Sequence, residues 1–221
     1  MQNTAESELL VGIPMDGHIH EGGLGMPAGA KGIVLFAHGS GSSRLSVRNT
    51  YVAGVLRRHG IATLLFDLLT EAEDRVYDTR FNIDLLTLRL RLATVWVQQQ
   101  PPLRQLGIGY FGASTGAAAA LKAAAALGGV IQAVVSRGGR PDLAGADLSR
   151  VSTPTLLIVG GNDDLVIDLN RKALGKLHAE KGLKIIPGAT HLFEEPGTLE
   201  QVAELAAGWF AQHLRSVKKA P

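Results

Sequence analysis

The sequence predicts an α/β fold in which helices flank a mainly parallel β-sheet. Short apolar runs rich in Val, Ile and Leu alternate along the chain with amphipathic segments of helical length. Several of these runs end in Gly, Ser, Asn or Asp, the residue types that form the turns after buried strands. No internal repeat and no long linker divides the 221 residues. We therefore expect one domain that spans residues 1–221.

Eight apolar runs are expected to be strands. The first two are joined by a turn at Asp16-Gly17 and are expected to form an antiparallel edge. The third run is apolar throughout, as is typical of a central strand that is buried on both faces. In chain order the expected strands are residues 9–13, 18–24, 32–37, 61–66, 106–111, 130–135, 155–159 and 183–186.

Five segments are expected to be helices. The second is the longest and ends before Pro101-Pro102, which cannot continue a helix. The third is rich in alanine and can therefore pack closely on the sheet. The highly charged residues 71–80 are expected to form a surface loop, and one helical turn is expected near residues 143–148. The expected helices are residues 49–59, 81–99, 117–126, 168–179 and 198–214.

The composition of the chain argues against several classes of function. The formal net charge is only +2, and the one dense basic cluster, Arg215, Lys218 and Lys219, is read as a solvated tail, so no nucleic-acid partner is expected. The absence of cysteine excludes disulfides, thiolate metal sites and a cysteine nucleophile. No apolar run reaches the length of a membrane span and no secretory signal is recognisable. We expect a cytoplasmic protein without a membrane partner.

No cofactor and no metal are expected. His18 and His20 alternate on a strand that is expected at the sheet edge, and such a pair can bind metal adventitiously. A surface pair without a ligand is the favoured interpretation. We therefore expect the catalytic residues to be side chains other than these two histidines.

The segment Gly112-x-Ser114-x-Gly116 follows an apolar strand and precedes the alanine-rich helix. This spacing is typical of a nucleophile elbow, in which the serine occupies a strained turn between strand and helix. The small flanking residues leave room for close backbone approach. The N-terminus of the following helix favours negative charge that develops beside the serine. Ser114 is the predicted nucleophile.

A serine hydroxyl needs a general base, which in this kind of site follows the serine in the chain. Three histidines follow Ser114, and two of them, His178 and His213, lie in expected helices. His191 alone lies in a loop directly after a strand. His191 is therefore the predicted base, although a histidine at that place can also serve only as a loop or capping residue.

The base in turn needs a carboxylate that orients it. Asp163 and Asp164 both follow the strand at residues 155–159. Asp163 is favoured because the turn Gly160-Gly161-Asn162 would place it at the carboxyl end of that strand. Asp164 remains an alternative, and it can instead cap the next helix, as can Asp168.

Two backbone amides are predicted to stabilise the oxyanion, those of Thr115, the residue after the nucleophile, and Ser40 in the Gly/Ser loop after residue 37. Arg137 follows a central strand directly and is predicted to bind an anionic group of the substrate. The alternative for Arg137 is a salt bridge to Asp142, Asp163 or a glutamate.

These motifs together resemble the α/β-hydrolase superfamily across nearly the whole chain. The resemblance is carried by His38-Gly39, by Gly112-x-Ser114-x-Gly116, by Gly160-x-x-Asp163 and by the post-strand His191. The pattern around Asp163 and His191 is most similar to the dienelactone-hydrolase-like branch. Residues 36–44 also resemble hydrolase domains that some bacteria fuse to a phosphoribosyltransferase-type domain, and no such partner domain is recognised here.

The resemblance implies an α/β-hydrolase fold with a mostly parallel sheet of about eight strands and a hydrolase that forms an acyl-enzyme. Dienelactone hydrolase itself uses a cysteine nucleophile, so Ser114 marks a serine variant and favours a general esterase. About twenty residues separate the strand at 130–135 from the next strand, too few for a cap domain.

We therefore expect a carboxylesterase-like serine hydrolase that acts on small soluble esters. Thioesterase, lactonase or dienelactone-hydrolase-like activity with the same three residues is the first alternative, since all these reactions share a tetrahedral intermediate. A non-catalytic binding protein on a hydrolase scaffold is the second. The expected partner is a small-molecule ester, and a homodimer is compatible with the sequence.

Overall fold

The computed structural model describes residues 8–217 and contains one eight-stranded sheet. The strands lie in the order β1-β2-β4-β3-β5-β6-β7-β8, and all neighbouring pairs are parallel except β1–β2 and β2–β4. The prediction of a mostly parallel sheet with an antiparallel edge is confirmed. The strands are β1 (Leu9–Met15), β2 (His18–Gly25), β3 (Gly32–Ala37), β4 (Ala62–Phe66), β5 (Gly107–Ala113), β6 (Ile131–Arg137), β7 (Thr155–Gly160) and β8 (Lys181–Ile186).

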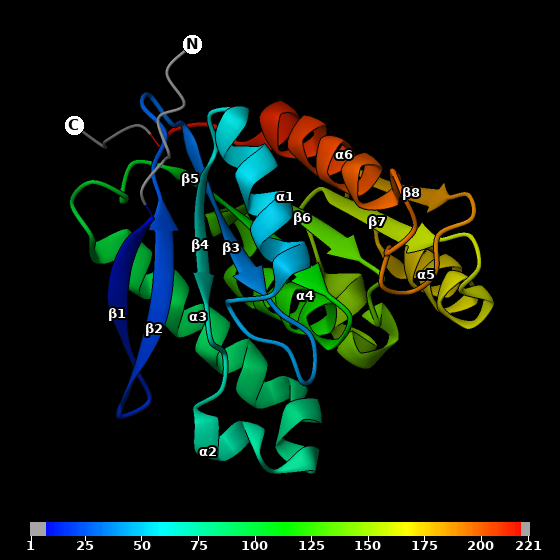
Figure 1. Ribbon diagram of the computed structural model, residues 1–221, viewed down its shortest axis with the longest axis horizontal. Coiled ribbons are helices and arrows are strands. Elements are labelled where there is room, and N and C mark those ends of the chain that lie inside the picture. Colours follow the sequence, from blue (N-terminus) through cyan, green and yellow to red (C-terminus); the bar gives the residue numbers. More distant parts are fainter. Residues whose placement is uncertain (1–7, 218–221) are drawn as a thin grey trace.

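Helices cover both faces of this sheet (Figure 1). Helices α1 and α6 contact each other over one face, where they bury one hydrophobic cluster, and α3 and α4 pack together over the other face. The helices are α1 (Val47–Arg58), α2 (Glu71–Asp74), α3 (Ile83–Gln99), α4 (Thr115–Leu127), α5 (Asp164–Lys176) and α6 (Thr198–His213). Short 3₁₀ helices span Tyr77–Phe81, Gly128–Val130 and Pro141–Arg150.

Two expectations about where helices form are wrong. Residues 71–80, expected as a loop, contain α2 and the start of a 3₁₀ helix, because Thr70 and Glu73 form a capping box that stabilises the first turn. Helix α5 begins at Asp164 rather than at residue 168 and ends at Lys176. His178 therefore lies beyond the helix in which it was expected.

The connection between β6 and β7 contains only the 3₁₀ segment Pro141–Arg150. This matches the expectation that no cap domain covers the sheet. The loops that follow β3, β5, β6, β7 and β8 all leave the same edge of the sheet, because these strands are parallel neighbours. That edge carries every residue of the predicted site.

The first strand begins and the last helix ends at the opposite end of the sheet, where the parallel strands start. Strand β1 runs in the same direction as β4, because β2 is antiparallel to both, and α6 returns across the sheet toward the strand starts. The backbone N–H of Val217 donates to the Gln105 carbonyl at 2.8 Å, just before β5 begins. Lys218 and Lys219 of the expected basic tail, and residues 1–7 of the N-terminal segment, lie outside the described residues.

His18 and His20 do not form a surface pair. Strand β2 is the second strand of the sheet rather than its edge, and the His20 side chain points into the protein, where the residue is only 3% exposed. His20 Nδ1–H donates to the Asp67 carbonyl at 2.8 Å, and its Nε2 accepts from Arg89 at 2.6 Å. Arg89 is itself buried and also binds Glu73 at 2.8 Å. His20 therefore has a structural role, because its hydrogen bond with Arg89 connects β2 to α3.

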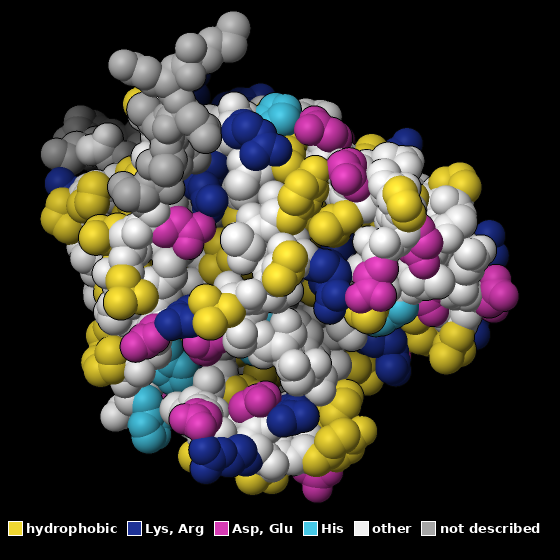
Figure 2. All heavy atoms as spheres, in the orientation of Figure 1, with side chains coloured by type: hydrophobic (Ala, Val, Ile, Leu, Met, Phe, Trp, Pro, Cys, Tyr) yellow, Lys and Arg dark blue, Asp and Glu magenta, His cyan; other side chains and the backbone are white. Residues whose placement is uncertain are grey.

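The surface carries mixed charge. Figure 2 shows basic and acidic side chains interspersed over one face of the molecule. Over residues 8–217 no helix is long and apolar enough to cross a membrane. In the same part of the chain no three His, Cys, Asp or Glu side chains gather in a way that could hold a metal ion.

Candidate active site

Ser114 occupies the turn between β5 and α4. Its φ and ψ are 49° and −120°, a conformation that residues with a side chain rarely adopt and that costs about 1–3 kcal/mol. Its hydroxyl makes no capping hydrogen bond to α4, although the residue stands at the N-cap position. The turn is held by two backbone bonds, from the Ser114 N–H to Arg137 O at 3.3 Å and from the Arg140 N–H to Ser114 O at 3.1 Å.

Glycine is required on both sides of this turn. A Cβ on Gly112 would lie 2.5 Å from Ala117 Cα, and a Cβ on Gly116 would lie 2.1 Å from the Ala37 carbonyl oxygen. These contacts are with backbone atoms that cannot move aside. The spacing seen in the sequence therefore reflects close packing of α4 on β5 and on the end of β3.

Asp163 and His191 form a direct hydrogen bond. His191 Nδ1–H donates to Asp163 Oδ2 at 2.6 Å, which leaves Nε2 as an acceptor. The Asp163 side chain is 16% exposed and that of His191 is 38% exposed. Asp164, the alternative acid, is exposed in the first turn of α5. The geometry thus assigns the orienting contact to Asp163.

The loops that carry these two residues are bound to each other. The Gly161 N–H donates to Ile186 O at 2.8 Å and the Asn162 N–H donates to Ala189 O at 2.9 Å. The Asn162 side chain also donates to Gly188 O at 3.0 Å. These three hydrogen bonds join the loop after β7 to the loop after β8, which favours a fixed position of the carboxylate relative to the imidazole.

The segment Arg137-Gly138 contacts both Ser114 and His191. Arg137 O accepts the Ser114 N–H, and a Cβ on Gly138 would lie 3.5 Å from His191 Cε1. Serine and imidazole thus lie against the same two residues at the end of β6. Within residues 8–217 no hydrogen bond joins the Ser114 hydroxyl to His191, a common situation in the absence of substrate.

The two predicted oxyanion donors lie next to each other. The Ser40 N–H donates to the Thr115 side-chain oxygen Oγ1 at 3.0 Å. The loop that carries Ser40 also lies against the nucleophile, because a Cβ on Gly39 would be 3.0 Å from Ser114 Cβ. In this structure the Ser40 amide is therefore occupied by the threonine hydroxyl. The sequence contained no signal for this contact.

His38 fixes the start of the same loop. The buried imidazole accepts the Leu68 N–H on Nε2 at 3.0 Å and donates from Nδ1–H to Gly39 O at 3.1 Å. Only the neutral ring can accept the Leu68 N–H on Nε2, and burial lowers the pKa of His38 below its usual value of 6.5. His38 thereby links the loops after β3 and β4, a contact between distant segments for which the sequence carries no signal beyond the His38-Gly39 motif.

Protonation of His38 is expected to destabilise the fold in acid. Because the pKa of this ring is lowered by folding, the unfolded chain binds more protons, so stability falls as pH decreases below about 6.5. In His38→Gln the amide oxygen can accept from Leu68 without titrating. Between pH 7 and pH 5 the wild-type melting temperature should fall about 2–4 °C more than that of the variant. Parallel slopes in a thermal-shift series would contradict this role for His38.

Within residues 8–217, Arg137 makes none of the ion pairs that the sequence left open. Its residue is 8% exposed, and its Nε and Nη1 are buried without a hydrogen-bond partner in residues 8–217. Asp142 instead binds Arg140, at 2.8 Å. Burial, and to a smaller degree the charge of Arg48, lowers the pKa of Arg137 to about 10. Arg48 was missed because its sequence context resembles that of any surface helix.

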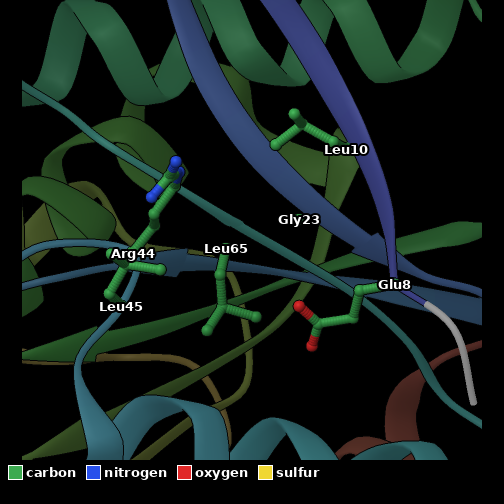
Figure 3. A pocket seen from close by; sticks show the side chains of 6 residues that line it. All are labelled: Glu8, Leu10, Gly23, Arg44, Leu45 and Leu65. Atoms are coloured by element: carbon green, nitrogen blue, oxygen red, sulfur yellow. The ribbon is translucent and has the colours of Figure 1, made fainter. Parts of the chain in front are cut away.

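Two hollows lie near the loop after β3. One of about 210 Å³ is lined by His38, Ser42, Ser43, Asp67, Leu69, Thr70, Glu71 and Asp74. The other, of about 170 Å³, lies between Glu8 and Arg44 with three leucines, Leu10, Leu45 and Leu65, around it (Figure 3). Its charged groups already bind partners, Glu8 on Arg57 and Arg44 on Glu21. The first hollow adjoins the loop after β3, and neither hollow is lined by Ser114, Asp163 or His191.

Comparison with solved structures places the whole chain in one fold. The dienelactone hydrolase from Anabaena variabilis is 54% identical, with a TM-score of 0.93 over 95% of this chain and 99% of that chain. A serine hydrolase without a lid from Xanthomonas campestris is 22% identical, with a TM-score of 0.75 over 93% of this chain and 94% of that one. Est1E from Butyrivibrio proteoclasticus is 16% identical with a TM-score of 0.78, over 92% and 98% of the two chains. The last two share the fold alone.

Two curated relatives from Mycobacterium tuberculosis are longer. Both are named putative phosphoribosyl transferase and are 57% identical over 202 residues, which is 91% of this chain and 44% of theirs. This chain therefore spans less than half the length of these relatives. A model described as the dienelactone hydrolase family matches residues 49–218, most of the chain. The chain thus belongs to the dienelactone hydrolase family and has the α/β-hydrolase fold.

Proposed function

We propose that residues 1–221 act as a single catalytic domain, a carboxylesterase-like serine hydrolase that cleaves small soluble esters through an acyl-enzyme on Ser114. One observation carries the proposal. The His191–Asp163 hydrogen bond leaves Nε2 as the acceptor that a serine nucleophile requires, and the same sheet edge holds Ser114 in a strained elbow.

The reaction has two halves. Ser114 Oγ attacks the ester carbonyl carbon while His191 Nε2 takes the hydroxyl proton, and the carbonyl becomes an oxyanion. Asp163 holds the protonated ring in place. The carbon–oxygen bond then breaks, and the imidazolium gives its proton to the departing alcohol. Water, activated by His191, attacks the acyl-enzyme in the second half and releases the carboxylic acid and free Ser114.

The backbone amides of Thr115 and Ser40 are proposed to donate to the oxyanion. Thr115 begins α4, so its N–H has no acceptor within the helix. The Ser40 amide is held by Thr115 Oγ1, so the oxyanion would have to share this donor with the hydroxyl or replace it. The threonine hydroxyl holds the Ser40 amide beside the first turn of α4, and it would have to turn away for the oxyanion to take the full hydrogen bond of that amide.

Opening of a cyclic ester is the second candidate. It is favoured by one specific observation, the 54% identity over nearly all of a solved structure that is named a dienelactone hydrolase. A lactone passes through the same tetrahedral intermediate, and its alcohol stays attached to the acyl group. A serine in place of the cysteine of dienelactone hydrolase proper still forms an acyl-enzyme, so the two candidates differ in substrate shape rather than in the residues used.

Fluorophosphonate labelling tests both candidates. We expect one covalent adduct per chain, which peptide mapping places on the peptide that contains Ser114. Labelling at another residue, or no labelling of folded protein, would contradict the proposal, and the latter would favour a binding protein without activity. A panel of 4-nitrophenyl esters, thioesters and lactones then separates linear from cyclic substrates.

A further inference from the structure

The side chain of Thr115 places a buried hydroxyl directly after the predicted nucleophile. Thr115 begins α4, next to Ser114, and only 3% of the residue is exposed. Its oxygen Oγ1 accepts the Ser40 N–H at 3.0 Å, and within residues 8–217 this is the only hydrogen bond of the hydroxyl. The oxygen is therefore used as an acceptor, whereas the hydrogen of the same hydroxyl has no acceptor in this part of the chain.

Other buried threonines of the described residues use this hydrogen. In α3 the acceptor is the carbonyl four residues earlier, as is usual for a threonine in a helix. Thr115 does not form that bond, because the residue four positions earlier belongs to β5. Only Thr63, whose oxygen accepts from Arg57 at 3.0 Å, likewise accepts without donating among the buried threonines of residues 8–217. The buried threonines that donate to a carbonyl oxygen are Thr87, Thr94, Thr153, Thr155 and Thr198.

The unpaired hydroxyl hydrogen of Thr115 lies beside the two amides that are proposed to bind the oxyanion. Oγ1 is 3.0 Å from the Ser40 nitrogen, and only Cα and Cβ separate it from the backbone nitrogen of its own residue. The loop that carries Ser40 is packed against the elbow, because a Cβ on Gly39 would lie 3.0 Å from Ser114 Cβ. An oxygen atom that is bound by both amides would therefore have the Thr115 hydroxyl as its neighbour.

We propose that the Thr115 hydroxyl is a third donor to the oxyanion, so that Thr115 is a catalytic residue through its side chain as well as its backbone amide. This rests on the proposed function at Ser114. When Ser114 Oγ adds to the ester carbonyl, the carbon–oxygen double bond becomes a single bond and its electron pair moves to the oxygen. The Oγ1–H group then donates to this oxyanion. The proton stays on Oγ1, so Thr115 changes its hydrogen bonding but not its charge.

The Ser40 amide supports this donor. A hydroxyl whose oxygen accepts a hydrogen bond is polarised by it and donates more strongly. This arrangement also keeps the buried groups bonded, because a hydroxyl that turned away to release the Ser40 amide would lose its only partner in the described part of the chain. The Ser40 N–H thus acts on the oxyanion in part through Oγ1 of Thr115.

Hydrolysis of 4-nitrophenyl butyrate by Thr115→Val tests the role of the hydroxyl. Valine keeps the branched shape of threonine but cannot donate. Loss of one oxyanion donor lowers kcat by about 10²- to 10³-fold in other enzymes, and direct binding of the released Ser40 amide to the oxyanion would recover part of this loss. We therefore expect kcat to fall by about 10-fold or more, with KM within about 3-fold of wild type. Thr115→Ser, which keeps the hydroxyl, should have a kcat within about 3-fold of wild type.

Thr63→Val is the matched control. Thr63 is buried on β4, and its hydroxyl also accepts without donating. We expect this variant to keep the wild-type kcat. Thr115→Ala is a second variant that leaves space for a water molecule at the Ser40 amide, so the test remains valid if valine disturbs the loop. The same selective loss of kcat is expected for Thr115→Ala.

Binding of a tetrahedral adduct separates oxyanion binding from a purely structural role. The probe 1,1,1-trifluoropentan-2-one carries the same propyl group as the butyrate ester, and its adduct with a serine hydroxyl bears an oxyanion without a leaving group. We expect the inhibition constant of this ketone to rise in Thr115→Val by about the factor by which kcat falls. An unchanged or higher kcat in Thr115→Val, an equal loss in Thr115→Ser, or a loss of kcat without weaker binding of the ketone would overturn the proposal.

Fluorophosphonate labelling of the wild-type enzyme distinguishes failure of this proposal from failure of the proposed function. If Ser114 is labelled and the wild-type enzyme hydrolyses the ester, but Thr115→Val has the same kcat, only the role of the Thr115 hydroxyl is wrong. If the folded wild-type protein is neither labelled nor active, the proposed function is wrong, and the hydroxyl has no oxyanion to bind.

Discussion

Ser114→Ala is expected to lower kcat by about 10⁴-fold or more, with the substrate KM nearly unchanged. Alanine removes the attacking oxygen and is still small enough for the turn. Residue 114 has a φ of 49° there, and the neighbouring backbone segments pack closely around it. Binding contacts and oxyanion donors remain, so a residual rate above that in water is expected. Steady-state kinetics on a chromogenic ester that wild-type enzyme hydrolyses measure the effect.

Ser136→Ala is a matched control for this prediction. Ser136 lies on β6, one strand from the nucleophile, and its buried hydroxyl has no hydrogen-bond partner in residues 8–217. We expect this variant to retain at least half of the wild-type kcat. If Ser114→Ala retained more than about 1% of the wild-type rate after purification free of host esterases, Ser114 would not be the nucleophile.

Asp163→Asn is expected to lower kcat by about 10³- to 10⁴-fold. The amide keeps the size of the carboxylate, but its NH₂ group would donate to His191 Nδ1. The proton of the ring would then lie on Nε2, which could no longer accept the hydroxyl proton of Ser114. The loss should appear in kcat for every substrate, because the orientation of the base is needed whatever group is bound.

Asp164→Asn distinguishes the two acids that the sequence left open. Asp164 is exposed in the first turn of α5, where its charge interacts favourably with the helix N-terminus by about 0.3–1 kcal/mol. We expect a slightly lower melting temperature and a kcat within 2-fold of wild type. The reverse result, with Asp164→Asn inactive and Asp163→Asn active, would show that the ring reorients in solution and that the hydrogen bond at 2.6 Å is not the working contact.

The sequence predicted Ser114, His191 and Asp163 as one site from local signals, and the structure places all three at the same end of the sheet. A nucleophile elbow must place small residues around the serine, and the base and acid must follow strands whose carboxyl ends meet at one edge. The Ser40–Thr115 hydrogen bond and the unpaired state of Arg137 depend instead on how segments far apart in the chain pack together. No pattern within a single segment reports such a contact, so the sequence allowed a salt bridge for Arg137 that is not found among residues 8–217.

The strands were predicted well because burial on both faces requires continuous apolar runs, as in β3 and β7. The errors occurred where polar side chains determine the structure. Residues 71–80 looked like a charged loop, yet Thr70 and Glu73 cap a short helix. His20 looked exposed from its alternation, yet its strand lies inside the sheet, where Arg89 satisfies its ring.

The direction of the first strand and the last helix has a consequence for assembly. Residue 8 and residue 217 both belong to the rim of the sheet that faces away from Ser114. A second polypeptide joined by a tether at either of these points would leave the rim that carries Ser114 uncovered. Such a protein could carry an additional activity on the same chain while both sites still exchange small molecules freely with solvent.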